Sequence, residues 1–310
     1  MGCGSWDSSS WSNYKTTNNI TDHSTVNTLY TSRSIQSSLD PKGVKMRESC
    51  DSDEHPNSNA VIIGLDVTGS MGYLAEEIAK NALNSLITEI YDNKSIVDPQ
   101  LMIAAIGDSY CDDAPLQVSQ FESDIRIAEQ LQQIYFESGG GGNGGESYLL
   151  LYYFAARHTS IDCMNKRNQK GILFTIGDEC CHDAIPARHI EKIFGDTDTG
   201  DIMFEDIYNE VSKMYEVYHI VIGDDSDWHG SKESWREKIG ERAIILKEKD
   251  VARIPQIIEA TLELKTGKKL DDITSRYDGS TALVIRDAVG HLSGVSNSVT
   301  TNTKKKLLEF

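Results

Sequence analysis

Short, continuous runs of hydrophobic residues alternate along the chain with segments whose hydrophobic residues recur every three or four positions. Continuous runs of this length are typical of strands buried on both faces of a parallel sheet. The segments with wider spacing are typical of helices that cover such a sheet with one face. The runs that predict buried strands are residues 60–65, 101–106, 171–176, 217–222 and 243–246.

The helical pattern is clearest after the first run, where Leu74, Ile78, Ala82 and Leu86 share one face and predict a helix to about Tyr91. The same pattern predicts helices within residues 125–134, 147–156, 185–215, 233–240 and 251–264.

Strands that alternate with helices predict an α/β fold with a doubly wound, mostly parallel central sheet flanked by helices, as in Rossmann-like proteins. The alternating residues 116–121 predict one short antiparallel edge strand on this sheet.

Composition divides the chain into three parts. Residues 1–58 are rich in Ser, Thr and Asn and poor in aliphatic side chains, which predicts a flexible arm; alternatively, residues 40–47 form an ordered strand on the core. Residues 59–265 contain all the predicted sheet strands. Residues 266–310 are expected to form a tail with one helix, within residues 281–292.

The overall charge and the cysteines limit the class of protein. The formal net charge is −18, so a polyphosphate would be repelled and nucleic-acid binding is not expected. No apolar stretch is long enough to span a membrane. The first residues lack a signal peptide, and Trp6 stands where N-myristoylation needs Ser or Thr. Six scattered cysteines show no disulfide framework, so a cytoplasmic protein with reduced thiols is expected.

Three loops that each follow a predicted strand or precede a helix carry polar residues toward one edge of the sheet. In open parallel sheets, ligands bind outside the carboxyl ends of the strands, where the strand order reverses. The polar residues are Asp66, Thr68 and Ser70 after the first strand, Asn143 and Glu146 on a glycine-rich loop, and Asp178 after the third long strand. Hydroxyl and carboxylate oxygens suit Mg²⁺ or Mn²⁺ better than zinc, so the sequence predicts a site for one of these ions.

At the first and last of these loops the sequence resembles von Willebrand factor A domains. Asp66-Val-Thr-Gly-Ser70 matches the Asp-x-Ser/Thr-x-Ser motif that begins the metal-ion-dependent adhesion site of that family. Asp178, after a buried strand, matches the last acidic ligand of the family. The resemblance covers residues 59–265, and the members that this chain resembles are the intracellular bacterial or phage ones.

The middle loop resembles a subset of the family that carries Asp-x-Pro-Glu with the Glu on the metal. Asn143-Gly-Gly-Glu146 departs from it, because Asn143 stands in place of the Asp and Gly145 in place of the Pro. The resemblance implies that Thr68, Ser70 and Glu146 lie nearest the ion. Asp66 and Asp178 would act mainly through water.

The resemblance implies that this chain is a binding module and not an enzyme. In that family the metal ion keeps one coordination position open, and an Asp or Glu of a partner protein completes the coordination shell. Intracellular relatives often act beside ATPases, so an adaptor to an ATPase or to an assembly is the expected role. The acidic surface suits a basic partner.

Two other functions compete with this interpretation. A haloacid-dehalogenase-like Mg²⁺ phosphohydrolase would use Asp66 as its nucleophile, but it needs a second Asp as general acid where this chain has Thr68. A purely structural subunit would keep the motif only as a vestige.

Two neighbouring groups have alternative interpretations as well. Cys180, Cys181 and His182 could bind zinc, although adjacent cysteines lack the spacing of zinc knuckles. Three acidic residues follow the second strand: Asp108, Asp112 and Asp113. They are expected to make the rim of the site more negative.

Overall fold

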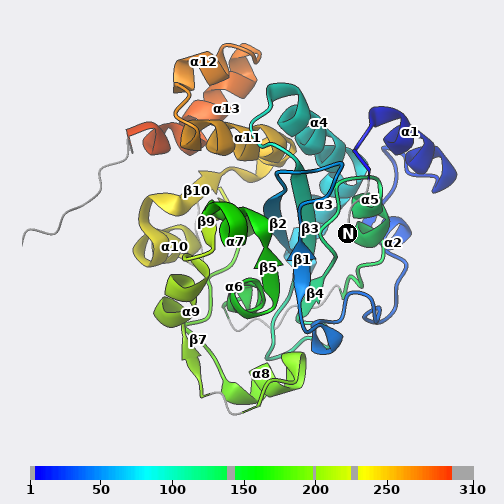
Figure 1. Ribbon diagram of the computed structural model, residues 1–310, viewed down its shortest axis with the longest axis vertical. Helices are drawn as coiled ribbons and strands as arrows, with labels where there is room; N and C mark the ends of the chain where they lie inside the picture. The colour runs from blue at the N-terminus through cyan, green and yellow to red at the C-terminus, as the bar shows by residue number, and fades with distance from the viewer. Residues whose placement is uncertain (1–3, 138–143, 198–199, 225–229, 295–310) are drawn as a thin grey trace, which may run out of the picture.

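The computed structural model describes residues 4–137, 144–197, 200–224 and 230–294, arranged around a six-stranded sheet (Figure 1). All neighbouring strands are parallel except β4, which runs antiparallel to β3 at one edge. The strands, in their order across the sheet, are β10 (Ala243–Leu246), β9 (Tyr215–Ile222), β6 (Gly171–Gly177), β2 (Asn59–Asp66), β3 (Pro99–Ile106) and β4 (Leu116–Val118). The predicted fold class and the antiparallel edge strand are confirmed.

The order of the strands reverses between β2 and β6. From β2 the chain moves outward through β3 and β4, and it then returns to the other side of β2 and continues through β6, β9 and β10. Counted along the chain, this is the 3-2-1-4-5-6 order of doubly wound sheets, whose ligands bind at the reversal. Leu65 lies beside Ile176, so β2 and β6 end at the same level.

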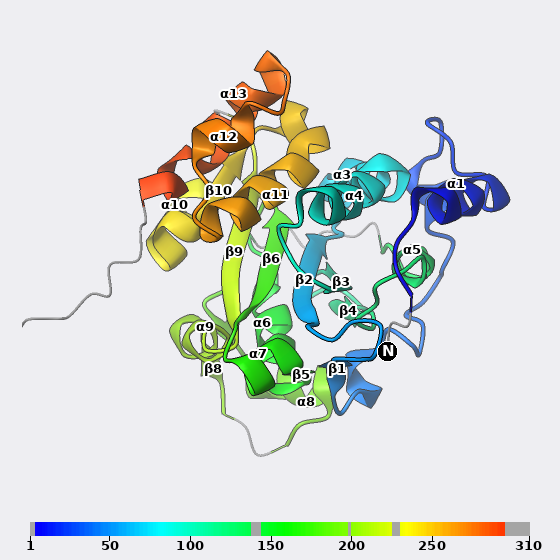
Figure 2. The ribbon, with the colours of Figure 1, turned by 45° about the horizontal axis from the view of Figure 1, so that its top comes forward.

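Helices cover both faces of the sheet, and each face has its own hydrophobic core (Figures 1 and 2). Alternate residues of β2 serve the two cores: Ile63 and Leu65 enter one and Ile62 enters the other. The helices on the first face include α3 (Gly72–Glu77), α4 (Leu83–Asn93), α5 (Arg126–Leu131) and α11 (Ile254–Lys265). Those on the second face are α6 (Tyr148–Arg157), α8 (Ala187–Phe194), α9 (Phe204–Val211) and α10 (Ser231–Ile239).

The predicted helix after the first strand is present, but it is not uniform. A π-helical segment, Ile78–Ala82, joins α3 to α4. The patterns had not predicted the small strands β5 (Thr159–Ile161), β7 (Ala184–Ile185) and β8 (Ile202–Met203), or the helix α7 (Asp162–Arg167). The 3₁₀ segments are Pro41–Gly43, Gly69–Met71, Gly240–Arg242, Glu248–Arg253 and Gly290–Gly294.

Residues 4–58 pack onto the domain, which differs from the flexible arm that composition predicted. They contain α1 (Ser8–Thr17), α2 (Val26–Leu29) and β1 (Arg47–Ser49), and β1 pairs in parallel with β5. Trp6 and Trp11 are buried in the first core, and Trp6 Nε1 donates to Asn84 Oδ1 of α4 at 3.1 Å. These two tryptophans provide apolar area that the average composition concealed.

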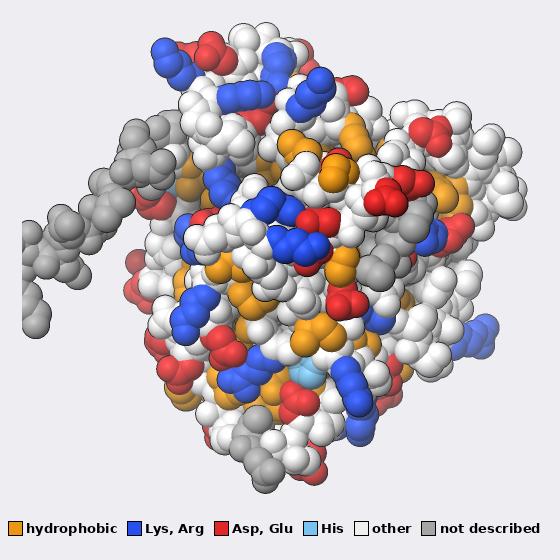
Figure 3. All heavy atoms as spheres, viewed as in Figure 1, with side chains coloured by type: hydrophobic (Ala, Val, Ile, Leu, Met, Phe, Trp, Pro, Cys, Tyr) orange, Lys and Arg blue, Asp and Glu red, His pale blue; other side chains and the backbone are white. Residues whose placement is uncertain are grey.

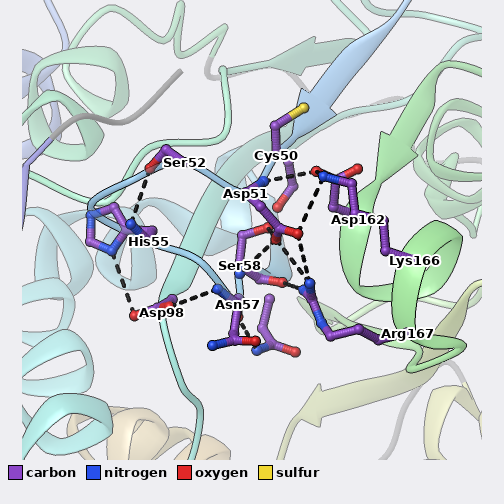
Figure 4. A network of polar contacts seen from close by, with 12 residues as sticks. Cys50, Asp51, Ser52, His55, Asn57, Ser58, Asp98, Asp162, Lys166 and Arg167 are labelled. Atoms are coloured by element: carbon purple, nitrogen blue, oxygen red, sulfur yellow. Dashed lines mark hydrogen bonds and ion pairs between the residues drawn. The ribbon is translucent and has the colours of Figure 1, made fainter.

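An ion-pair network fixes the segment between β1 and β2 to α7 (Figure 4). Arg167 donates to both carboxylate oxygens of Asp51, at 3.0 and 2.8 Å. The Asp51 backbone N–H donates to Asp162 at 2.8 Å, and Ser58 donates to Asp51. Because Ser58 directly precedes β2, this network lies at the amino ends of the strands, opposite the edge where Asp66 ends β2.

The tail expected to hold one helix contains two in its described part, α12 (Leu270–Thr274) and α13 (Gly279–Val289). Buried Glu263 of α11 accepts ion pairs from Lys268 and Arg276, which holds this segment to the domain. The division of the chain at residues 58 and 265 stays a prediction, and residues 295–310 lie outside the described part. Within the described ranges, no helix has both the length and the apolar character needed to cross a membrane.

We expect Trp11→Ala to lower the free energy of unfolding by about 3 kcal/mol, because it removes a large buried side chain and leaves a cavity. Chemical denaturation measures this change. Leu283→Ala is the matched control, since Leu283 is 63% exposed and its truncation should cost about 0.5 kcal/mol or less. Equal, small losses in both variants would contradict the packing of the N-terminal segment.

Candidate functional site at the reversal of strand order

The central strand β2 ends in a fully buried carboxylate, Asp66. Its Oδ1 accepts two hydrogen bonds from Thr68, one from the backbone N–H at 2.9 Å and one from the hydroxyl at 2.6 Å. These two bonds close a local turn, since Thr68 lies only two residues beyond Asp66. Thr68 is itself buried, so the predicted first motif forms a closed pair of side chains.

A tyrosine that the sequence analysis missed holds the other oxygen of Asp66. The Tyr148 hydroxyl, in the first turn of α6, donates to Asp66 Oδ2 at 2.7 Å. Gly177 ends β6 beside them, and a Cβ there would lie 1.9 Å from the Tyr148 hydroxyl and 2.8 Å from Asp66 Oδ2. Glycine is therefore required at 177 for the phenol and the carboxylate to meet.

Glu146 is held next to this pair by the chain that follows β6. Its backbone N–H donates to the Cys180 carbonyl at 2.8 Å, and its carbonyl accepts from the His182 N–H at 3.3 Å. The side chain is only 5% exposed. Its Oε2 is buried and, among the residues that the structure describes, has no hydrogen-bond partner.

Electrostatic interactions link Asp66 to each of the other two predicted carboxylates. Burial raises the pKa of Asp66 above its usual range, and the charge of Asp178 raises it further. Burial also raises the pKa of Glu146, and the charge of Asp66 adds to that shift. Asp178 follows β6 directly and is half-buried. Asp66 thus lies within electrostatic reach of both Asp178 and Glu146.

Two predicted residues are described only in part or not at all. The backbone of Ser70 lies in the 3₁₀ turn Gly69–Met71 directly after Thr68, but its side chain lies outside the description. Asn143 and the glycines before it also lie outside the described residues.

The predicted site offers carboxylate and hydroxyl oxygens, which are better ligands for a hard cation than for zinc. Across the described ranges, no three His, Cys, Asp or Glu side chains are grouped closely enough to hold a metal by themselves. A site here would therefore depend on hydroxyls and water as well as carboxylates, which Mg²⁺ accepts. The geometry does not favour a zinc site at residues 180–182. Cys181 is buried, which raises the pKa of its thiol, and His182 Nε2 lies 2.9 Å from Asp108 Oδ1.

Aromatic side chains form a solid wall behind Tyr148. Trp235 is fully buried, stacks on the His219 ring at 3.6 Å and donates from Nε1 to the Glu179 carbonyl at 3.1 Å. Tyr148 contacts both rings edge-on. Burial lowers the pKa of His219 well below its usual range, so this wall adds no positive charge beside Asp66.

No family model matches the sequence, and a search of curated proteins found no match. Solved structures similar to this one include a von Willebrand factor type A protein from Catenulispora acidiphila, at 15% identity and a TM-score of 0.39 over 69% of this chain and 44% of that one. Another is the mussel byssus proximal thread matrix protein 1 with a zinc-occupied MIDAS motif, at 11% identity and a TM-score of 0.43 over 69% of this chain and 49% of that one. The pilus adhesin SpaC from Lactobacillus rhamnosus GG has 14% identity and a TM-score of 0.40, over 76% of this chain and 31% of the adhesin. The chain thus spans less than half the length of each.

We expect Tyr148→Phe to lower the free energy of unfolding by about 1–2 kcal/mol and to weaken divalent-metal binding, because a buried Asp66 oxygen loses its donor. Calorimetry and denaturation measure the two effects. The matched control is Tyr152→Phe, on the same helix, whose hydroxyl contacts Thr175 Oγ1 at 3.1 Å and not a carboxylate. Equal metal affinity in the two variants would show that the Tyr148 hydroxyl does not position Asp66.

The raised pKa values of Asp66 and Glu146 also predict how stability depends on pH. In the unfolded chain both groups lose their protons near pH 4, whereas the metal-free folded protein retains them to higher pH. The folded state therefore binds more protons, and its stability falls as pH rises from about 4 toward and beyond neutral. Urea denaturation in chelator at several pH values measures this slope.

Glu146→Gln is the comparison for that experiment, because an amide cannot titrate. Glu259, whose pKa burial raises to about 7, contributes equally to both proteins and so cancels in the difference. The slope should be shallower in Glu146→Gln. A slope that is unchanged by this substitution would contradict the assignment.

Proposed function

We propose that residues 59–265 form a von Willebrand factor A-like binding module. It would hold Mg²⁺ or Mn²⁺ through the carboxylates and hydroxyls of the candidate site and bind a carboxylate of a partner protein through that ion. The residues that would hold the ion are Asp66, Thr68, Ser70, Glu146 and Asp178. The observation that carries the proposal is the buried Glu146 Oε2, which lacks a hydrogen-bond partner among the described residues.

A buried carboxylate without a partner is costly, and a cation is the group that offsets that cost best. Glu146 is also repelled by the charge of Asp66, so the two ionised side chains gain more from a shared cation than either would alone. When bound, the ion would supply a positive centre able to accept a further oxygen ligand. The place supports the proposal too, because ligands bind where the order of parallel strands reverses.

The geometry favours a binding module over the phosphohydrolase alternative. A nucleophilic Asp66 would have to reach a phosphorus atom, yet the residue is fully buried and both of its oxygens accept hydrogen bonds. The position that needs a general acid holds Thr68, whose hydroxyl donates to Asp66. Asp66 is thus placed to orient ligands and not to attack a substrate.

The role that fits such a module is that of an adaptor, with the ion joining it to an ATPase or to another assembly in the cytoplasm. A net charge of −18 argues against a polyanionic partner and favours a basic one. On the face seen in Figure 3, acidic and basic side chains are interspersed, so the partner would recognise local groups and not a uniform field.

Calorimetric titration of Mg²⁺ and of Mn²⁺ into the intact chain tests the proposal. We expect one ion per chain, with affinity at least about tenfold weaker in Glu146→Gln because a ligand oxygen is replaced by an amide. Glu205→Gln, an exposed glutamate in the first turn of α9, is the matched control and should bind like the wild type. Equal affinity in all three proteins, or no binding in any, would refute the site.

A further inference from the structure

An exposed tyrosine stands beside the candidate metal site. Tyr110 lies in the loop between β3 and β4 and is 50% exposed, although most large hydrophobic side chains of the described residues are buried. Its ring is held edge-on between two imidazoles, His182 at 4.9 Å and His189 at 4.7 Å between ring centroids. These three rings are called the Tyr110 platform below.

Hydrogen bonds fix the platform from beneath. His182 Nε2 is 2.9 Å from Asp108 Oδ1, and His189 Nδ1 is 2.8 Å from Ser109 Oγ. The Tyr110 backbone N–H donates to Asp108 Oδ1 at 3.1 Å. Because these rings are already held in place, they lose little conformational entropy when a partner binds on them.

The platform is physically joined to Glu146. The His182 backbone N–H donates to the Glu146 carbonyl at 3.3 Å. A Cβ at Gly145 would lie 3.1 Å from the His182 ring, so the loop that carries Glu146 runs against the platform. The next residue, Ser147, donates to Asp108 Oδ1 at 3.1 Å. A segment bound at Glu146 would therefore pass close to Tyr110.

The same side of the site is acidic. Asp112 and Asp113 follow Tyr110, and the Asp113 backbone N–H donates to both carboxylate oxygens of Glu137 at 3.0 Å. Asp112, Asp113 and Glu137 are called the acidic rim. Asp112 Oδ2 accepts a hydrogen bond from the Asp108 backbone N–H at 2.6 Å, so the rim is joined to the residue that holds the platform.

Basic residues lie near the His189 ring of the platform. Burial lowers the pKa of His189, and the charges of Arg188 and Lys192 of α8 lower it further. Positive charge on the protein thus lies within electrostatic reach of His189, whereas Tyr110 is followed along the loop by the carboxylates of the acidic rim.

We propose, resting on the proposed function, that the partner segment whose carboxylate binds the metal also presents a lysine or arginine to the Tyr110 platform and the acidic rim. One divalent ion neutralises two of the three carboxylates of the site, so a fourth carboxylate brought by the partner meets excess negative charge. A neighbouring cation on the partner offsets that repulsion. Tyrosine faces bind lysine and arginine side chains, and tyrosines are frequent anchors of interfaces.

The experiment uses the magnesium-loaded, full-length chain and short dye-labelled synthetic peptides followed by fluorescence anisotropy. Three peptides have a central Asp that is flanked on both sides by Lys, by Ser or by Glu. A fourth peptide has Lys flanks and a central Asn. We expect the Lys-flanked Asp peptide to bind at least about tenfold more tightly than the Glu-flanked one at low salt, with the preference shrinking near 1 M salt.

Tyr110→Ala tests the platform itself. It should weaken the Lys-flanked peptide about three- to tenfold and the Ser-flanked peptide less, since only the former places a cation on the ring. Met203→Ala is the matched control, a large hydrophobic side chain with 46% exposure in β8. A loss that is equal for Lys and Ser flanks would indicate a structural role and overturn the proposal.

The outcomes separate this inference from the function on which it rests. If magnesium does not bind the wild type, or if the Asn peptide binds as well as the Asp peptide, the proposed function fails. If magnesium binds and peptide binding depends on Asp but not on the flanking charge, only the present inference fails. Magnesium binding without measurable affinity for the Lys-flanked Asp peptide would also overturn it.

Discussion

The candidate site depends on one constraint: a fully buried carboxylate ends the central strand of the sheet. Asp66 can remain there because Thr68 and Tyr148 satisfy its two oxygens from opposite sides. The absence of a side chain at Gly177 gives the tyrosine its space. Turn, helix start and strand end are therefore fixed relative to one another by a single buried group.

The second carboxylate is held in a different way. Glu146 is placed by backbone hydrogen bonds to the segment after β6, while its Oε2 remains without a partner among the described residues. The Asp66 position is thus internally satisfied and the Glu146 position is not. This difference makes Glu146 the more informative residue, because an unsatisfied buried carboxylate requires a physical explanation that a satisfied one does not.

The rest of the chain supports this edge from a distance. Helices on both faces bury the sheet in two separate cores, and the N-terminal segment adds Trp6 and Trp11 to one of them. The Asp51–Arg167 network secures the opposite ends of the strands. These ion pairs thus lie at the end of the sheet opposite the candidate site.

The sequence alone determined the strands and the main helices, because continuous and three-to-four-spaced hydrophobic patterns follow directly from burial on two faces or one. It also placed Asp66, Thr68, Glu146 and Asp178 at strand and helix ends. Only the tertiary structure decided that the N-terminal segment packs on the core, since average composition hides two well-placed tryptophans. Only it revealed Tyr148 as the partner of Asp66, because that contact joins residues 82 positions apart through space and leaves no periodic trace in the sequence.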